Sequence, residues 1–473
     1  MALTIHGTTS AVALKTDTSN IGLGANAVDS ITTGDYNVGI GDDAMTATTE
    51  GGYNVAVGHE AMKANTTGGN NVSIGDSSME ANTTGNNNVA VGRGAFTVNT
   101  TGSANTAVGK GSLDANTTAN HNTALGYIAL GANSTGTENT AVGSEVLEAN
   151  TTGINNTAVG YNALKANTTT NHCTAVGHNA LLVNVAHENT AVGSSAMASN
   201  TSGTTNVAVG KTALYANTTG SSNVAVGYQA LDTNTTGSTN VAIGAYALKD
   251  ATTAGGNIAV GRGAGGGLTT GEGNIIIGYD AGDHGTSVET GGNCILIGNY
   301  TQAGSTAPSQ SVTIGYAVDG ADSTFTFGFG SSDTRCTNGS TSWSAPSDQR
   351  LKEEITTSTA GLGFINDLRP VTFKWKKEKD IPTDLAGYVE GSDTRYKTDT
   401  TEHGFIAQEV KTAIDAHSEI KDGFDMWQTD EQADGGRQRI GDASLMPMMV
   451  KAIQELSTAL DAAVARIKTL EDK

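Results

Sequence analysis

A glycine recurs along most of this chain at a nearly constant spacing. Aligned on the pattern N-x-x-[VIL]-G, the closing glycines run from Gly24 to Gly315, and all but two of the intervals between them equal that from Gly41 to Gly58. A fixed period of about 17 residues is typical of a solenoid, in which each repeat packs only on its neighbours. The pattern therefore predicts a stack of nearly identical coils over residues 20–315.

Each repeat contains a short segment with the alternation of a β-strand. The residue before the glycine is Val, Ile or Leu, the residue two places earlier is Val, Ile or Thr, and a small residue lies between them, as in Val55, Ala56 and Val57. Alternating β-branched residues favour a strand. We expect the β-branched side chains to face the interior of the coil and the alanines to face outward. A Leu, Met or Phe four residues after most glycines, such as Met62, predicts a second strand that faces the first.

Two strands and two turns within one repeat indicate a β-roll, and no six-residue subperiod supports a triangular solenoid. At about 4.8 Å per stacked strand, the repeats would form a rod of roughly 80 Å. The outward alanine rows of three chains could then pack closely, which predicts a parallel homotrimer. In its strand motif the repeat resembles the head of the trimeric autotransporter adhesins, a trimeric β-roll, although the period here is longer.

Asparagine forms two columns of its own. It opens 15 of the 18 strands, and it recurs seven residues after the glycine in eleven successive repeats, from Asn65 to Asn234. Stacked asparagines form hydrogen-bonded ladders and also suit turns. We expect this structural role rather than a ligand-binding array.

Composition excludes several classes of protein. The net charge is −21 and no basic stripe is present, so we expect no nucleic-acid partner. The three cysteines, Cys173, Cys294 and Cys336, are far apart and lack metal-site spacing, which predicts free thiols, no metal and no cofactor. No signal peptide and no apolar run long enough to insert into a membrane is recognised, so we expect synthesis in the cytoplasm.

The character of the sequence changes after the repeats. Residues 316–346 contain the alternating aromatics Phe325, Phe327 and Phe329, and then Trp343. This pattern predicts two or three strands that either cap the solenoid or present a receptor-binding tip. Capping is the preferred interpretation, because the open end of a solenoid must be covered.

Residues 347–473 resemble a known family. The chain reads S-D-Q-R-L-K-E-E-I from Ser347, L-R-P-V-T-F-K-W from Leu368 and H-G-F-I-A-Q-E-V from His403. In this order and at the end of a chain, the three segments are similar to the intramolecular chaperone domain of endosialidase tailspikes, the S74 peptidase family. The resemblance implies a homotrimeric bacteriophage tail fibre or tailspike whose C-terminal domain assembles the fibre and then cuts itself off.

The resemblance also implies a catalytic pair. Ser347 would be the nucleophile and Lys352 the general base, while Asp348 and Arg350 would support the dyad. A serine hydroxyl is a weak nucleophile that needs a base, and a lysine that is partly desolvated in a trimer interface can lose its proton near neutral pH. Attack on the Pro346 carbonyl would favour cleavage before Ser347, although the bond after it stays an alternative.

The last helix carries a heptad seam. Apolar residues follow a 3-4-3-4 spacing, which predicts a coiled coil without fixing the number of strands; the positions are Met446, Met449, Ile453, Leu456, Leu460, Ala463, Ile467 and Leu470.

Together these patterns predict a mostly β protein: a trimeric β-roll or β-solenoid, followed by an α+β chaperone domain that ends in a coiled-coil helix. Residues 1–19 would attach to another phage tail protein, 20–315 would form the shaft, 316–346 the cap or tip, and 347–473 the self-cleaving domain. We expect a tail fibre of the virion that binds a bacterial surface receptor, a glycan or outer-membrane component, through residues that the sequence does not identify.

Two other functions are weighed against this one. A capsule-degrading tailspike needs paired carboxylates and usually aromatic platforms. The repeats show no such pair, although a site shared between chains stays open as an alternative. A cell-surface adhesin would be expected to have a signal peptide and an anchor.

Overall fold

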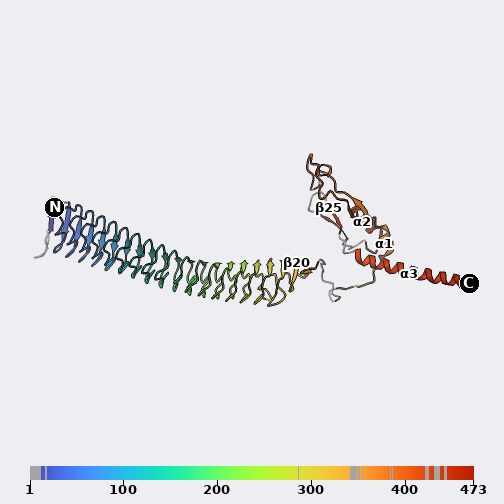
Figure 1. Ribbon diagram of the computed structural model, residues 1–473, viewed down its shortest axis with the longest axis horizontal. Helices are drawn as coiled ribbons and strands as arrows, with labels where there is room; N and C mark the ends of the chain where they lie inside the picture. The colour runs from blue at the N-terminus through green and yellow to red at the C-terminus, as the bar shows by residue number, and fades with distance from the viewer. Residues whose placement is uncertain are drawn as a thin grey trace. The chain divides into compact units, whose positions relative to one another are not determined.

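The computed structural model describes residues 12–15, 19–285, 287–340, 349, 352–353, 355–383, 385, 387–420, 426–430, 437–440 and 445–472. The chain separates into two compact units, residues 1–346 and residues 347–473. The first unit is almost entirely a β-solenoid that spans residues 21–329, and the second is a small α+β unit with a long C-terminal helix (Figure 1). The fold class expected from the sequence is confirmed.

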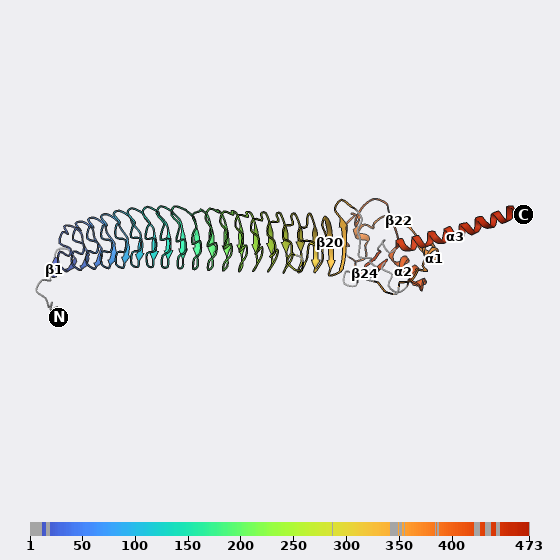
Figure 2. The ribbon, with the colours of Figure 1, turned by 90° about the horizontal axis from the view of Figure 1, so that it is seen from below.

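The solenoid is one parallel sheet to which each coil contributes one short strand. Its arrows stand in a single row, and loops form the rest of each coil (Figure 2). Identical positions of successive coils pair directly, as Ala158 does with Ala175. The strands are β1 (Val12–Lys15), β2 (Asn20–Leu23), β3 (Val38–Ile40), β4 (Val55–Val57), β5 (Val72–Ile74), β6 (Val89–Val91), β7 (Thr106–Val108), β8 (Thr123–Leu125), β9 (Thr140–Val142), β10 (Thr157–Val159), β11 (Thr174–Val176), β12 (Thr190–Val192), β13 (Val207–Val209), β14 (Val224–Val226), β15 (Val241–Ile243), β16 (Ile258–Val260), β17 (Ile275–Ile277), β18 (Ile295–Ile297), β19 (Val312–Tyr316), β20 (Thr324–Phe329) and β21 (Ser332–Thr337).

The predicted inward and outward faces of the strand are reversed in the structure. The central residue, such as Ala90, is fully buried, whereas the flanking β-branched residues are half-buried or exposed, with Ile74 at 40% and Ile243 at 41%. In most coils the narrow interior already holds one Leu, Met or Phe, so a small side chain lies opposite it. At Gly39, for instance, an added Cβ would lie 2.9 Å from a methyl carbon of Val28. Where glycine takes the place of the Leu, Met or Phe, at Gly265 and Gly282, the larger Ile276 and Leu296 fill the space. The expectation that alanine rows form the outer surface was therefore wrong.

The second strand predicted in each repeat is not formed, and turns take its place. The segment around Met62 forms tight turns in which Glu60 and Met62 have φ values of +56° and +54°. These left-handed residues aim the long side chain into the coil, where Met62 is fully buried. The turns still bond from coil to coil, as when the Met62 amide donates to the Ser78 carbonyl at 3.0 Å. The backbone groups are thus satisfied without an extended conformation.

The glycine that closes each strand is required by close approach of the backbone. Gly58 has a φ of +143°, and a Cβ at this position would lie 2.4 Å from the Gly75 carbonyl oxygen. Only glycine avoids both the strained conformation and this clash. The constant spacing of the glycines therefore follows from the close stacking of successive coils.

Both asparagine columns are buried ladders, as expected. Asn71 donates its backbone N–H to Asn54 Oδ1 at 3.0 Å and its side-chain Nδ2 to the Gly85 carbonyl at 2.9 Å. In the second column, Asn82 donates to Asn65 Oδ1 at 2.9 Å. Each side chain thus joins adjacent coils and satisfies turn carbonyls inside the solenoid. The three cysteines are free and buried, also as expected.

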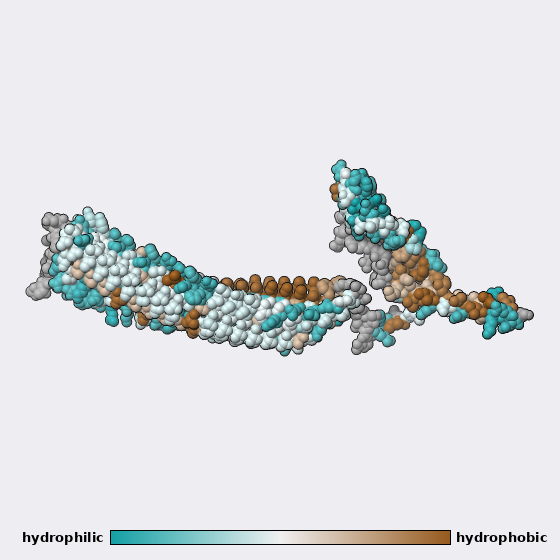
Figure 3. All heavy atoms as spheres, in the orientation of Figure 1, coloured by the Kyte–Doolittle hydropathy of each residue, from teal (hydrophilic) through white to brown (hydrophobic). Residues whose placement is uncertain are grey.

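The exposed face of the sheet changes composition along the solenoid. From β13 to β19 both flanking columns are Val or Ile, and these side chains form a continuous apolar band in Figure 3. From β7 to β12 the first flanking position is threonine instead. We call the Val/Ile columns of β13–β19 the sheet face.

The stack continues past Gly315. β20 pairs in parallel with β19, and β21 returns antiparallel to β20. An antiparallel β1–β2 pair covers the other end of the sheet. Trp343 lies outside the described residues.

The second unit contains three α-helices, two short antiparallel pairs and a 3-10 turn among its described residues. These elements are α1 (Leu362–Asp367), β22 (Val371–Phe373), η2 (Glu378–Asp380), β23 (Glu402–Gly404), α2 (Ala407–Ala416), β24 (Trp427–Asp430), β25 (Arg437–Ile440) and α3 (Leu445–Glu471), with β22 paired to β23 and β24 to β25. A small core forms around Phe364 of α1, with Val410 and Ile414 of α2 packed beside it.

The predicted terminal helix is present as α3. Its seam residues are exposed, with values from 48% at Met449 to 68% at Met446. Within the described part of the chain, no helix is both long enough and apolar enough to cross a membrane.

Candidate functional site

The sequence places its candidate self-cleavage site at the start of the second unit. Of the four residues, Ser347, Asp348 and Arg350 lie outside the described residues. Lys352 is exposed, and its backbone N–H donates to the Gln349 carbonyl at 3.1 Å. The catalytic pair therefore stays a prediction. Its position coincides with the division of the chain between residues 346 and 347.

The two other motif segments meet in the folded unit. Arg369 precedes the proline of the first segment, and its Nε donates to Glu409 Oε2 of the second at 2.9 Å. The guanidinium lowers the pKa of Glu409, while the same pair raises the pKa of Arg369. Because both side chains are exposed, solvent screens the ion pair, which therefore contributes little to the free energy of folding and mainly orients the two segments. The ion pair holds the segment after α1 against the start of α2.

The tryptophan of the first motif segment lies in a polar and aromatic surrounding. Trp375 packs edge-on against Phe373, with ring centroids 5.4 Å apart, and Lys397 Nζ lies 4.4 Å from the indole centroid. Its backbone carbonyl accepts a 2.7 Å hydrogen bond from Arg395. The contacts of Trp375 thus hold the long connection between β22 and β23 in place.

Beside this segment, β22 and β23 border an open apolar hollow of about 710 Å³. Its lining combines both motif segments, including Pro370, Phe373 and Phe405, with Leu445 at the start of α3.

A histidine links α1 to the end of α2. His417 Nε2 lies 2.9 Å from Asp367 Oδ2, its Nδ1 lies 3.0 Å from Glu419 Oε1, and its ring packs edge-on against Phe364. The Asp367 carboxylate, followed by Glu419, raises the pKa of His417. No motif pointed to this residue, because a lone histidine gives no signal in the sequence.

The terminal helix is joined to α1 by a carboxylate. Glu455 Oε2 of α3 accepts the backbone N–H of Leu362 at 2.8 Å, at the first turn of α1. An added Cβ on Gly361 would lie 2.6 Å from the same oxygen. Gly361 therefore makes room for the side chain that docks α3.

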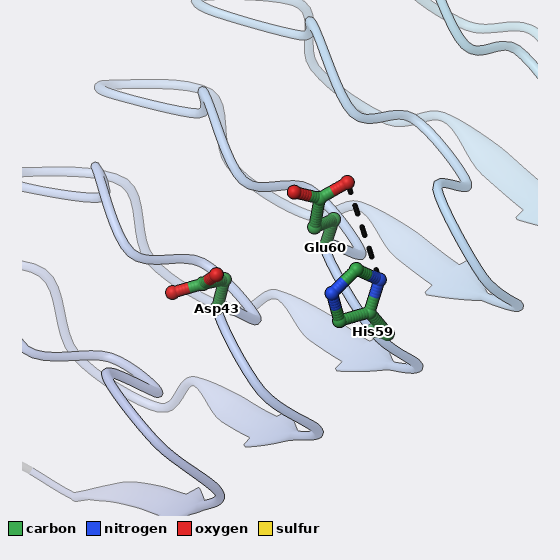
Figure 4. A group of neighbouring side chains, drawn as sticks. All are labelled: Asp43, His59 and Glu60. Carbon is green, nitrogen blue, oxygen red and sulfur yellow. Dashed lines mark ion pairs between the residues drawn. The ribbon is translucent and has the colours of Figure 1, made fainter.

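One cluster in the solenoid has the residue types of a metal site. Asp43, His59 and Glu60 offer ligand atoms that all lie within 4.8 Å of one another, from two successive coils (Figure 4). However, Lys63 Nζ lies 2.7 Å from Glu60 Oε1, and that hydrogen bond raises the pKa of Lys63. His59 also lies 3.3 Å from Asp76. The cluster is an exposed network of charges in which a lysine already neutralises one carboxylate, and we assign it no metal.

Comparison with known proteins finds a family match in the first part of the second unit. Residues 347–418 match the family Peptidase_S74, described as chaperone of endosialidase. No curated protein and no solved structure shows a significant match to the chain. The C-terminal region therefore carries a chaperone-of-endosialidase domain, preceded by β-solenoid repeats.

Domains of this class are typical of phage tail fibres and tailspikes with an autocleaved chaperone, and they function in trimeric proteins. The match implies a capacity for self-cleavage. It covers all four predicted site residues, both motif segments and His417.

Proposed function

We propose that this chain is the precursor of a homotrimeric phage tail fibre that binds a bacterial surface receptor. Its C-terminal domain would assemble three solenoids and then release itself. The main support for this proposal is the Peptidase_S74 match at residues 347–418, which follows a solenoid that spans residues 21–329. Residues 1–19 would attach the fibre to another tail protein in the virion.

Two apolar surfaces support the trimer. The sheet face exposes Val and Ile along seven successive strands, and an apolar surface of this continuity marks an interaction site. The seam of α3 exposes a second apolar row in the other unit. Three parallel copies related by a threefold axis would cover both surfaces and leave no unpaired copy. The sheet face, rather than the alanine rows, would thus form the contact between the three solenoids.

Self-cleavage would follow from Ser347 as nucleophile and Lys352 as general base, with Asp348 and Arg350 in support. Lys352 is exposed in the single chain, and assembly would have to desolvate it before its proton is lost near neutral pH. Cleavage would thereby depend on correct assembly. Removing the domain would also leave the fibre held by its barrier to unfolding.

The test is a denaturing gel beside a native mass measurement. Wild type should give a trimer and two fragments, the smaller of which would run from Ser347 to Lys473. Ser347→Ala and Lys352→Ala should each leave one band at the full 47.9 kDa and still form trimers. Cleavage in Ser347→Ala would contradict the dyad, and a monomeric mass in wild type would contradict the fibre assignment.

A further inference from the structure

A continuous column of aromatic and cationic side chains follows the C-terminal half of the solenoid. Each of the strands β13 to β20 contributes one member, placed one or two residues after the glycine near the end of the strand. In chain order the members are Lys211, Tyr228, Tyr246, Arg262, Tyr279, Tyr300, Tyr316 and Phe329. We call this column the aromatic ladder.

Each member of the aromatic ladder contacts the next. The rings of Tyr228 and Tyr246 lie 5.2 Å apart at 83°, and those of Tyr279 and Tyr300 lie 5.2 Å apart at 76°. Arg262 lies between these pairs, 5.9 Å from the Tyr246 centroid and 5.3 Å from the Tyr279 centroid. It also donates a 2.6 Å hydrogen bond to the Tyr279 hydroxyl. In each edge-to-face pair the rim of one ring contacts one face of the other and leaves the opposite face outside that pair. Tyr316 and Phe329 instead stack face to face, with centroids 5.1 Å apart.

Several members of the aromatic ladder are open to solvent, while Tyr246 and Tyr300 are half-buried. Tyr279 is 36% exposed, Tyr316 is 46% exposed and Phe329 is 69% exposed. Contacts of this kind between neighbouring rings stabilise the solenoid, but such a stabilising role does not require exposed rings. In the coils before Lys211 the position after the glycine is mixed: it holds charged residues such as Asp42 and Asp76 and also exposed tyrosines, Tyr127 and Tyr161. The longest series of aromatic and cationic side chains that is unbroken from coil to coil therefore runs from Lys211 to Phe329.

The largest coil adds another ring to this stretch. The interval between Gly278 and Gly298 is the longest in the series, and it contains His284. The His284 ring lies 4.8 Å from that of Tyr300. The extra residues in this coil therefore widen the aromatic surface where the ladder is most continuous.

A polar cleft borders the same rings. Its volume is about 240 Å³, and its lining includes Tyr246, Lys249, Asp250, Arg262, Asp280 and Asp283. Two cationic groups face three carboxylates there, so the cleft offers both donors and acceptors without an excess of positive charge. Such a surface would repel an acidic polymer and would hydrogen-bond to hydroxyl groups.

We propose that the aromatic ladder and its cleft bind a linear neutral glycan. The apolar C–H faces of pyranose rings stack on exposed aromatic faces, while their hydroxyls require hydrogen-bonding partners at the side. The coils are spaced by about 4.8 Å, close to the length of one pyranose along a chain, so successive sugars meet successive rungs. This inference rests on the proposed function, because it assigns a surface and a ligand class to the receptor-binding role.

The experiment is affinity electrophoresis of the full-length gene product as expressed. Native gels are cast with dextran, mannan or galactan as neutral probes, or with alginate as an acidic probe. We expect at least one neutral polysaccharide to retard wild type and alginate not to. The double variant Tyr279→Ala/Tyr300→Ala should lose affinity by at least about tenfold.

The matched control is Tyr36→Ala/Tyr53→Ala. These two exposed tyrosines stack near the other end of the solenoid, with ring centroids 4.9 Å apart. The control substitution therefore also removes an aromatic contact between coils, but it leaves the aromatic ladder unchanged. The control should keep wild-type retardation, and both variants should keep the trimeric mass.

Four results would overturn the inference: no retardation by any neutral polysaccharide, retardation by alginate alone, equal loss in both double variants, or loss of the trimer in Tyr279→Ala/Tyr300→Ala. The last result would make the aromatic ladder an interface between copies. Because trimer mass and self-cleavage are measured separately, a failure of glycan binding alone would leave the proposed function standing.

Discussion

Single buried asparagines have an unusually large role in this solenoid. The Asn139 backbone N–H donates to Asn122 Oδ1 at 3.0 Å, its Nδ2 donates to the Gly153 carbonyl at 2.8 Å, and its Oδ1 accepts the Asn156 backbone N–H at 3.0 Å. All of these groups lie inside the coil, where water cannot replace a lost partner. At such a rung asparagine supplies a donor and an acceptor together, which a cysteine, as at Cys173, does not.

We expect Asn139→Ala to loosen its own and the adjoining coils. The substitution leaves buried donors and acceptors unpaired, at a cost of about 1–3 kcal/mol for each. Hydrogen exchange should show faster exchange in β9 and β10 than in wild type. The control is Asn86→Ala, because Asn86 is an exposed asparagine that also bonds to the neighbouring coil. Equal effects of the two substitutions would show that burial of the ladder is unimportant.

His417 should make the second unit sensitive to pH. Asp367 and Glu419 raise its pKa in the folded state above the ordinary value of 6.5. The protonated histidine therefore stabilises the fold fully below about pH 6.5, and this contribution is lost as the pH rises through the folded pKa. Uncleaved Ser347→Ala protein should show faster hydrogen exchange in α1 and α2 at pH 8 than at pH 6, after correction for intrinsic rates. Adding His417→Gln should flatten this dependence; an unchanged slope would assign it to other groups.

At the scale of single elements, the sheet shows how a three-residue strand gains its stability. A strand of this length has little stability alone, but those within the solenoid pair on both sides with similar neighbours, and most bury a small central residue against a Leu, Met or Phe. The flanking Val and Ile contribute little to the interior of their own coil. Their apolar character instead belongs to the outer surface, which is why we assign them to contacts between chains.

We expect Val226→Asp/Val260→Asp to prevent assembly of the solenoids. Both residues lie on the sheet face at half-buried flanking positions, so a single chain could place the carboxylates in water, whereas a trimer would have to bury them unpaired. Native mass and thermal denaturation should show a loss of trimer or a clear fall in Tm. The control Thr236→Asp changes an exposed turn residue and should leave both unchanged. A normal trimer from the double variant would exclude the sheet face as the interface.

At the scale of the whole molecule, the difficulty is register. Successive coils are nearly identical, so three chains shifted by one whole repeat would still match one another along most of their length. A domain that trimerises separately would fix the alignment before the solenoids join. This requirement explains why a repetitive fibre would carry a chaperone that is later removed.

A chain that ends at Pro346 should therefore aggregate or form misaligned assemblies when it is expressed alone. The full-length Ser347→Ala chain provides the control, because it keeps the chaperone attached. Size-exclusion chromatography with mass detection should give a uniform trimer for the control and a heterogeneous or insoluble product for the shortened chain. Soluble, thermally stable trimers of the shortened chain would show that the domain is dispensable.

The sequence alone determined the period, the first strand of each repeat and the asparagine ladders, because equivalent positions of stacked coils meet the same demands and therefore hold the same residue types. Gly58 and Asn71 could be interpreted directly, since one residue type satisfies each backbone or hydrogen-bonding demand. The three motif segments likewise located the chaperone domain and its candidate residues from Ser347 to Lys352.

The tertiary structure decided which side of each strand is inside. Alternation in V-A-V defines two faces, but it does not say which one is buried; the narrow coil decides that, because Met62 and most of its equivalents leave room only for a small residue such as alanine. For the same reason the aromatic ladder could not be predicted: Tyr279 and Tyr300 occupy different positions after their glycines, and only the turns bring their rings together. Contacts between distant motif segments, such as Arg369 with Glu409, likewise depend on packing that no local pattern encodes.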